Sequence, residues 1–243
     1  MQRVAYNGAW RAKMNIAIYD LDKTVTRRST FTPFLLFFAR RHKPLRLAAL
    51  PVWIGALVGY WVGLYDRKPL KQFGIALFMG RQHKPEMLAC VTSEFASDVV
   101  MRGLQPGAVK AIECDRRNGS RLVLATAAPE FYAKEIGARL GFDVVVATRH
   151  VIGTDSYVGH HIDGENCYGG IKLKMIEAWL RSQKLDRSGC DITVYSDHVS
   201  DAPLLDWADR AYLVNPSVKL QKLAAAKNWH VRNFASDDAK SDR

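Results

Sequence analysis

Five short apolar runs divide this chain, and most of them end on a polar side chain. The runs are residues 16–19, 121–126, 143–148, 191–197 and 211–214. Runs of this length, rich in Ile, Val and Leu, are typical of strands that are buried on both faces of a sheet. Helical periodicity follows some of them, most clearly in residues 171–183 and 216–228. Strands that alternate with helices form right-handed βαβ units, so the sequence predicts an α/β fold with a parallel sheet.

Three of the predicted strands end on side chains that can take part in chemistry, namely Asp20, Thr126 and Asp197. In a parallel sheet, ligands bind beyond the carboxyl ends of the strands. We therefore expect these three side chains to converge at one edge of the sheet, although they are far apart in the sequence.

The sequence directly after the first predicted strand is Asp20-Leu21-Asp22-Lys23-Thr24. Residues two apart in a strand point to the same side, so Asp20 and Asp22 can act on one substrate. The first carboxylate can attack the phosphorus of a phosphate ester, while the second acts as general acid and then as general base. The D-x-D-x-T pattern is common by chance, but a buried strand directly before it favours Asp20 as the nucleophile.

An aspartate that carries a phosphoryl group needs positive charge nearby, and Mg²⁺ suits carboxylate and phosphate oxygens. Asp197 is the best further ligand, with Asp201 one helical turn later. Taken alone, Asp197 would be interpreted as a helix N-cap and Asp201 as a surface acid. Lys172, which opens a predicted helix after two glycines, can neutralise phosphoryl oxygens in the transition state, with Lys174 as a rival. Thr126 either donates its hydroxyl to the phosphate or simply ends a strand.

Residues 27–118 interrupt the alternation of strands and helices. They are rich in Leu, Phe, Trp, Gly and Arg and look helical. We predict a core domain formed by residues 1–26 and 119–243, and a helical cap domain, residues 27–118, inserted after the first strand and packed over the site. Residues 149–170 are rich in turn-forming residues, which predicts a small hairpin or flap.

Taken in order, these residues resemble the haloacid dehalogenase (HAD) superfamily, subfamily IB, the phosphoserine-phosphatase-like branch with a helical (C1-type) cap. The resemblance covers nearly the whole chain, and the ordered set of four motifs is far more specific than any single one. The motifs are Asp20-Leu21-Asp22-Lys23-Thr24, Leu124-Ala125-Thr126, Cys167-Tyr168-Gly169-Gly170-Ile171-Lys172 and Tyr195-Ser196-Asp197-His198-Val199-Ser200-Asp201.

The resemblance implies a Rossmann-like core and a phosphatase, that is, a phosphoric monoester hydrolase. It implies that Mg²⁺ is held by Asp20, Asp197 and the backbone carbonyl of Asp22. It also implies that the phosphoryl group passes to Asp20 before water releases it, and it favours Lys172 over Lys174 as the phosphate-binding lysine.

The chain also departs from the usual family motifs. Ser196 and His198 stand where Gly and Ser are usual in the fourth motif, and Lys23 replaces a common Gly in the first. All four acids and the lysine are present, so we expect an active enzyme. Thr24 and Asp201 are its secondary site residues.

The substrate prediction depends on the residues after the first motif. True phosphoserine phosphatases usually carry a Glu nine residues after the nucleophile, and this chain has Ser29 there, next to Arg27 and Arg28. A basic rim suits a substrate with further negative charge, so we expect a small organic or lipid phosphate in preference to L-phosphoserine. An L-phosphoserine phosphatase, and a phosphotransferase that uses the same intermediate, remain the alternatives.

Residues 47–65 carry no charged side chain and are long enough to span a bilayer. A single span would put Asp20 and the later site residues on opposite sides of the membrane, which excludes it for an enzyme of this kind. Two interpretations remain: a helix buried within the cap, or a cap that rests on anionic membrane. In the second, the headgroups would meet Arg40, Arg41, Lys43 and Arg46.

The net charge of +11 is concentrated near the N-terminus, since residues 1–50 hold ten Lys or Arg and two acids. This favours anionic partners without choosing among them, and leaves a catalytically silent membrane- or nucleic-acid-binding module as the non-enzyme alternative. No recognised nucleic-acid module is present, so we expect no specific nucleic acid. Four dispersed cysteines and no secretory signal favour the cytoplasm, with peripheral contact at the inner face of the membrane. The oligomeric state is not specified.

Overall fold

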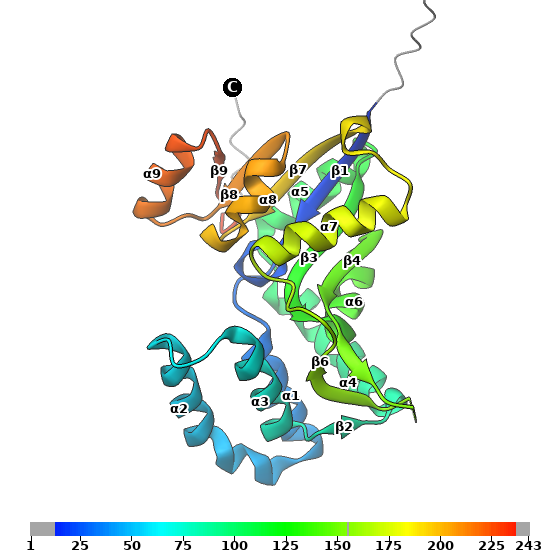
Figure 1. The fold of residues 1–243 in the computed structure, drawn as a ribbon, viewed down its shortest axis with the longest axis vertical. Helices are drawn as coiled ribbons and strands as arrows, with labels where there is room; N and C mark the ends of the chain where they lie inside the picture. Colours follow the sequence, from blue (N-terminus) through cyan, green and yellow to red (C-terminus); the bar gives the residue numbers. More distant parts are fainter. Residues whose placement is uncertain (1–12, 155, 237–243) are drawn as a thin grey trace, which may run out of the picture.

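The computed structural model of the chain describes residues 13–154 and 156–236. In this part, six parallel strands form the central sheet, in the order β4-β3-β1-β7-β8-β9 (Figure 1). The predicted α/β fold is confirmed, and the five predicted strands are all present; the short edge strand β9 was not predicted. The strands are β1 (Met14–Tyr19), β3 (Arg121–Pro129), β4 (Val144–Thr148), β7 (Cys190–Ser196), β8 (Arg210–Val214) and β9 (His230–Arg232).

Helices cover both faces of this sheet, as the apolar character of its strands requires. Along β1, Ile16 and Ile18 belong to one hydrophobic cluster, while Ala17 and Tyr19 belong to the other. All four side chains are at most 1% exposed. The first cluster lies under α7 (Gly170–Ser182), α8 (Ala202–Trp207) and α9 (Val218–Ala226), and the second under α5 (Pro106–Arg117) and α6 (Glu130–Arg139).

Four further helices lie between β1 and α5 in the sequence: α1 (Phe31–His42), α2 (Leu50–Trp61), α3 (Arg67–Phe78) and α4 (Pro85–Asp98). The first three lie beyond the end of β1 that carries Asp20 (Figure 1). The aromatic ring of Phe34 in α1 packs on Phe95 of α4 and on Tyr132 of α6, with centroid distances of 5.1 and 4.7 Å. The cap and the core therefore share one hydrophobic cluster.

The predicted hairpin in residues 149–170 is formed by β5 (His150–Ile152) and β6 (Val158–Ile162), which pair in antiparallel fashion. The sequence did not reveal that β6 also pairs with β2 (Gln82–His83), a two-residue strand from the cap region. The backbone N–H of Ile162 donates to Gln72 Oε1 in α3 at 2.9 Å. The hairpin is thereby fastened to the cap helices.

The two segments that lead into and out of the cap lie side by side, and we call residues 25–27 and 103–105 the neck. Thr26 and Leu104 form an antiparallel bridge. Arg27 N donates to Gly103 O at 2.7 Å, and Gln105 N donates to Val25 O at 3.0 Å. The cap boundary at residue 118 stays a prediction. The packing of α5 against the sheet favours a boundary at the neck, because a helix buried on β3 belongs physically to the core.

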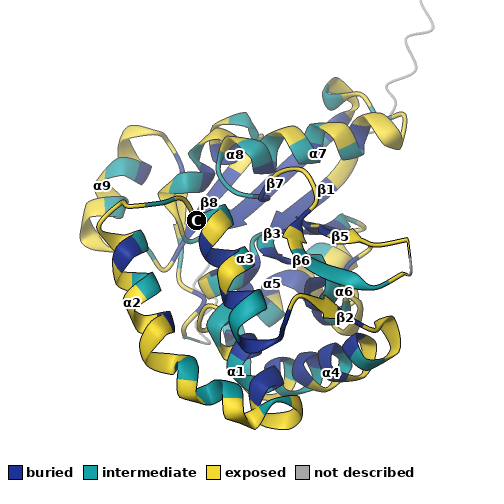
Figure 2. Cartoon of the chain, turned by 60° about the horizontal axis from the view of Figure 1, so that its bottom comes forward, coloured by how far each residue is buried: buried dark blue, intermediate teal, exposed yellow. Residues whose placement is uncertain are grey.

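The apolar segment 47–65 is not a buried helix of the cap, so that interpretation was wrong. A 3₁₀ turn (Pro44–Ala49) leads into α2, and α2 buries only Trp53 and Gly59 (Figure 2). Leu45 is 91% exposed, Trp61 85% and Leu64 75%. The physical reason is that α3 and the 3₁₀ turn meet one side of α2, while no described element covers the other.

Candidate active site

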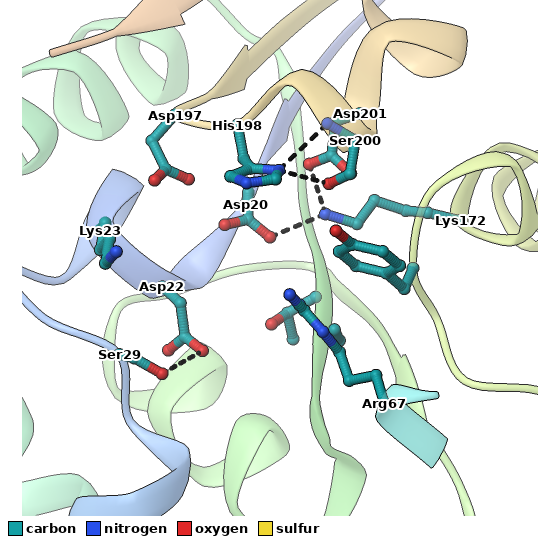
Figure 3. Close-up of a pocket in the computed structure, with 13 residues that line it drawn as sticks. Asp20, Asp22, Lys23, Ser29, Arg67, Lys172, Asp197, His198, Ser200 and Asp201 are labelled. Atoms are coloured by element: carbon teal, nitrogen blue, oxygen red, sulfur yellow. Dashed lines mark hydrogen bonds and ion pairs between the residues drawn. The ribbon is translucent and has the colours of Figure 1, made fainter. Parts of the chain in front are cut away.

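The side chains at the carboxyl ends of β1, β3 and β7 meet in one pocket of about 190 Å³ (Figure 3). The cap contributes Arg67, the first residue of α3, to its wall. This is the convergence expected of a parallel sheet. The pocket is lined, among others, by Asp20, Asp22, Thr126, Lys172, Asp197 and Asp201.

Lys172 joins two of the acids. Its Nζ donates to Asp20 Oδ1 at 2.7 Å and to Asp201 Oδ2 at 2.6 Å. Ser196 Oγ donates to the same Asp201 oxygen at 2.7 Å. The Lys172 residue is only 2% exposed, and a buried ammonium group is stable only with such partners. Gly169, at a φ of 59°, turns the chain into α7 so that Lys172 enters the pocket from the first helical turn.

The pocket holds more negative than positive charge. Burial raises the pKa of Asp20 to about 7; the neighbouring Lys172 lowers this pKa, but Asp201 and Asp22 raise it further. Burial lowers the pKa of Lys172, yet its two carboxylate partners bring it well above the usual range. Lys172 is therefore charged at neutral pH. Together with Lys23 and Arg67 it gives three cations against the four acids that line the pocket.

The Asp22 carboxylate points away from Lys172 and toward the start of α1 (Figure 3). Its Oδ1 accepts hydrogen bonds from Thr30 N at 2.8 Å and Thr30 Oγ1 at 2.7 Å, and its Oδ2 accepts from Ser29 Oγ at 3.2 Å. Lys23, with a φ of 62°, provides the backbone turn directly after Asp22. The second acid of the motif is thus bonded to the cap.

Asp197 lies across the pocket from Lys172, with Asp20 between them (Figure 3). Its Oδ1 accepts a long hydrogen bond of 3.4 Å from Thr24 Oγ1, and burial raises the pKa of its carboxyl group. In residues 13–154 and 156–236, no three His, Cys, Asp or Glu side chains form a metal cluster. Two carboxylates and one backbone carbonyl are a donor set of a different kind, and hard cations such as Mg²⁺ accept it. This donor set is the one that the family resemblance implies, and it stays a prediction.

Thr126 and Ser29 line the pocket, but Arg27 and Arg28 do not. Thr126 Oγ1 accepts from Ala128 N at 3.0 Å, which leaves its hydroxyl proton available to a ligand. Arg27 and Arg28 border a separate groove beside α4, and Arg27 Nε donates to Leu104 O of the neck at 2.9 Å. The basic rim expected from these two arginines is therefore not part of the pocket wall.

Sequence reasoning missed two cap residues near the site. Arg67 lies over the ring of Tyr168, with its guanidinium carbon 3.9 Å from the ring centroid, and no sequence signal marked it. Lys71 is buried and donates to Asn166 Oδ1 at 2.6 Å and to the carbonyl of Ala127, beside Thr126. Burial, and secondarily Arg67, lower the pKa of Lys71 to about 7. The available signal was a lysine at helical spacing from apolar residues, four before Ile75 and seven before Phe78, on the buried face of α3.

Comparisons with known proteins agree with this geometry. A family model described as haloacid dehalogenase-like hydrolase matches residues 17–206. An "inhibition of morphological differentiation protein" from Streptomyces azureus is 28% identical over 90% of this chain and 78% of its own length. A histidinol-phosphatase from Neisseria meningitidis is 26% identical over 90% of this chain and 99% of its own length.

Solved structures show the same fold. A protein of unknown function from Bordetella pertussis Tohama I superimposes with a TM-score of 0.82 at 26% identity, covering 91% of this chain and 99% of that one. A phosphoserine phosphatase solved as a phospho-aspartyl intermediate analogue has a TM-score of 0.60 at 14% identity, covering 93% of this chain and 95% of that one. The second likeness concerns the fold alone.

Proposed function

The chain belongs to the haloacid dehalogenase-like hydrolase family and is a phosphoric monoester hydrolase, and we propose that it is a Mg²⁺-dependent phosphatase with Asp20 as nucleophile. One observation carries this proposal. Lys172 Nζ is bonded to Asp20 and to Asp201 inside a pocket that also receives Asp22, Thr126 and Asp197. This arrangement offers a nucleophile, an acid and a fixed positive charge to one phosphoryl group.

In the proposed reaction, a carboxylate oxygen of Asp20 attacks phosphorus and the ester P–O bond breaks. The leaving oxygen takes a proton from Asp22. Asp22 then removes a proton from water, the water oxygen attacks phosphorus, and phosphate leaves with Asp20 restored. Lys172 and the Thr126 hydroxyl bind the non-bridging oxygens throughout. Thr30 donates two hydrogen bonds to Asp22 Oδ1 and would hold this acid in position.

The excess of acids supports a bound Mg²⁺, which HAD phosphatases generally use. Asp20, Asp197 and the carbonyl of Asp22 would hold it, and when bound it would offset the charge of the phosphoryl oxygens. Burial raises the pKa of both Asp20 and Asp197, and a cation bound between them would lower both values. Thr24 and Asp201 then serve to orient Asp197 and Lys172.

The pocket favours an anionic substrate that carries charge beyond the phosphate. Arg67 and Lys23 line it, and Ser29 stands at its wall where an acid would attract an ammonium group. A small organic or lipid phosphate fits these side chains better than L-phosphoserine does. A panel of sugar, polyol and lipid phosphates, measured beside phosphoserine, tests this; much faster cleavage of phosphoserine would contradict it.

The central test is phosphate release from p-nitrophenyl phosphate with and without Mg²⁺. We expect Asp20→Asn to lower the rate by roughly a thousandfold or more, because an amide cannot act as the nucleophile. The matched control is Asp206→Asn, which removes an exposed carboxylate paired with Lys227 at 2.7 Å on α8. Equal loss in both variants, or none in either, would overturn the mechanism.

The same assay separates the alternatives. Adding glycerol as an acceptor and observing the products by phosphorus NMR distinguishes a phosphotransferase, which would form glycerol phosphate, from a hydrolase. Absence of any Mg²⁺-dependent phosphate release by the native chain would instead favour a catalytically silent binding module.

A further inference from the structure

One side of α2 and the turn after it form a continuous apolar surface, which we call the α2 face. Figure 2 shows most of α2 as exposed. The exposed residues of this side are almost all large and apolar. Monomeric proteins rarely leave such a patch open to water without a use for it. The α2 face comprises Leu50, Ile54, Val58, Trp61, Val62 and Leu64.

The opposite side of α2 is fixed in place, so the exposure does not come from a loose element. Trp53 is 1% exposed and packs against Phe31 and Phe78, with ring centroids 6.2 and 6.1 Å apart. At the C-terminal end of α2, the hydroxyl of Tyr65 donates to the carbonyl of Ala56. The α2 face is a defined surface of the folded cap.

Charge distinguishes between the occupants that such a face can accept. Residues 40–68 contain six Lys or Arg and a single acid, Asp66. Two of the expected cations are engaged elsewhere, since Arg41 pairs with Glu94 at 3.0 Å and Arg46 donates to Ala76 O at 2.7 Å. The remainder still surround an uncharged segment with positive charge at both ends. A second copy of the chain would bring like charge against like, whereas anionic headgroups are complementary.

Packing and aromatic placement argue for a surface position. Helical structure runs over the 18 residues Pro44–Trp61, which have a mean hydropathy of 1.2, are 11% buried and are long enough by length and composition to cross a membrane. One side of α2 is nevertheless packed on the cap through Trp53, so the helix does not present an apolar surface all round, as a membrane span would. Trp61, 85% exposed at the C-terminal end of α2, has the amphipathic ring typical of a bilayer interface.

We propose that the α2 face docks the protein peripherally on an anionic lipid bilayer, with α2 lying in the plane of the interface. The docked surface is next to the pocket, because only five residues separate Trp61 from Arg67 in the pocket wall. Arg67 Nε also donates to Tyr60 Oη, at 3.2 Å, at the end of α2. Docking would therefore place the pocket mouth at the membrane surface. The surface itself does not depend on the proposed chemistry.

The test is co-sedimentation of the full chain with phosphatidylglycerol–phosphatidylcholine vesicles, and with vesicles of phosphatidylcholine alone. We expect binding to the anionic vesicles that weakens with added salt, and at least about tenfold weaker binding of the double variant Ile54→Glu, Val58→Glu. The matched control is Met101→Glu, Val218→Glu, which makes the same charge change at two apolar residues that are each 71% exposed and lie outside the α2 face.

Trp61 provides a second measurement that does not alter charge. Vesicle binding should shift the tryptophan emission of the native chain to the blue, and Trp61→Phe should remove most of the shift. Asp20→Asn should bind vesicles as the native chain does, which separates docking from catalysis. The proposal is overturned if both double variants bind equally. It is also overturned if the native chain is a dimer in solution that Ile54→Glu, Val58→Glu converts to a monomer, since the occupant would then be a second copy.

Discussion

Helices α1 and α2 have the same length and lie in the same cap, yet they are buried to opposite extents. The α1 helix ends in Arg40, Arg41 and His42 and still buries four side chains completely; α2 carries no charge and buries two residues. The more apolar helix is thus the more exposed one. Apolar character alone does not decide burial in this molecule, because a helix also needs packing partners around it.

The neighbours of the two helices account for the difference. The α1 helix packs against α3 and α4, and through Phe34 against α6 of the core, so that apolar groups surround its buried side. The α2 helix meets α3 and the preceding 3₁₀ turn along one edge. Its outer side chains remain in contact with water, and covering them with an apolar surface would be favourable.

Gly74 of α3 is the point where the two helices come together, and it gives the largest expected effect. A Cβ there would lie 2.8 Å from Trp53 Cη2 of α2 and 2.9 Å from Leu35 Cδ1 of α1. We expect Gly74→Ala to lower the free energy of unfolding by up to about 3 kcal/mol through overpacking.

The matched substitution is Gly55→Ala, where a Cβ would meet nothing within 4 Å. An alanine in the open helix α2 should raise the free energy of unfolding by about 0.5–1 kcal/mol. Urea unfolding measures both. Two effects of the same sign would mean that α2 is not packed on α3 as described.

Acid should weaken the small sheet beside α1 and leave α2 unaffected. Burial, and secondarily the charge of Lys71, lower the pKa of His150 in β5 from its ordinary 6.5 to about 4. The unfolded chain therefore takes up this proton first. The stabilising contribution is complete above the unfolded pKa and is lost as the pH falls toward about 4, which amounts to about 2 kcal/mol between pH 7 and pH 5.

The measurement is the free energy of unfolding against pH for the native chain and for His150→Gln. The variant should show a shallower acid slope, whatever its stability at pH 7, and the exposed His161→Gln serves as control. If His150→Gln has the same acid slope as the native chain, uptake of a proton by His150 on unfolding does not account for the loss of stability.

The smallest expected effect concerns the start of α1, where Thr30 is hydrogen-bonded to the proposed general acid Asp22. Thr30 donates both its backbone N–H and its hydroxyl to Asp22 Oδ1. Thr30→Val removes the hydroxyl hydrogen bond to Asp22, and we expect kcat to fall by about tenfold while the fold is kept. Val58→Thr on α2 is the opposite exchange and should leave kcat for p-nitrophenyl phosphate unchanged. A shift in KM alone for Thr30→Val would mean that Thr30 positions substrate and not the acid.

Local patterns in the sequence were enough to predict the parallel sheet. Each of the five predicted core strands is a short apolar run, and such a run can be recognised without knowing its distant neighbours. The edge strand β9 and strand β2 could not be predicted, because three and two residues carry too little pattern. The exposure of α2 was also beyond reach, since an apolar run reads the same whether or not a neighbour covers it.

The pocket residues show the same difference between features set by local pattern and features set by tertiary packing. Asp20, Thr126 and Asp197 were predictable because strand ends in a parallel sheet converge by topology. Arg67 was not, because its place depends on how α3 packs over the sheet. The orientation of Asp22 was equally hidden, since it follows from hydrogen bonds to Thr30 and Ser29 across a bend in the backbone.

The neck has a consequence for how such a molecule can be remodelled. The chain enters and leaves the cap across a single bridge, Thr26 with Leu104, and the Gln105 side chain ties the exit segment to the carbonyl of Lys23 at 2.6 Å. A segment whose two ends are adjacent can be exchanged as a cassette without altering the register of the sheet. If the α2 face docks on lipid as proposed, grafting a cap without it onto residues 25–27 and 103–105 would release the protein from the membrane, while Asp20, Lys172 and Asp197 would stay in place on the core.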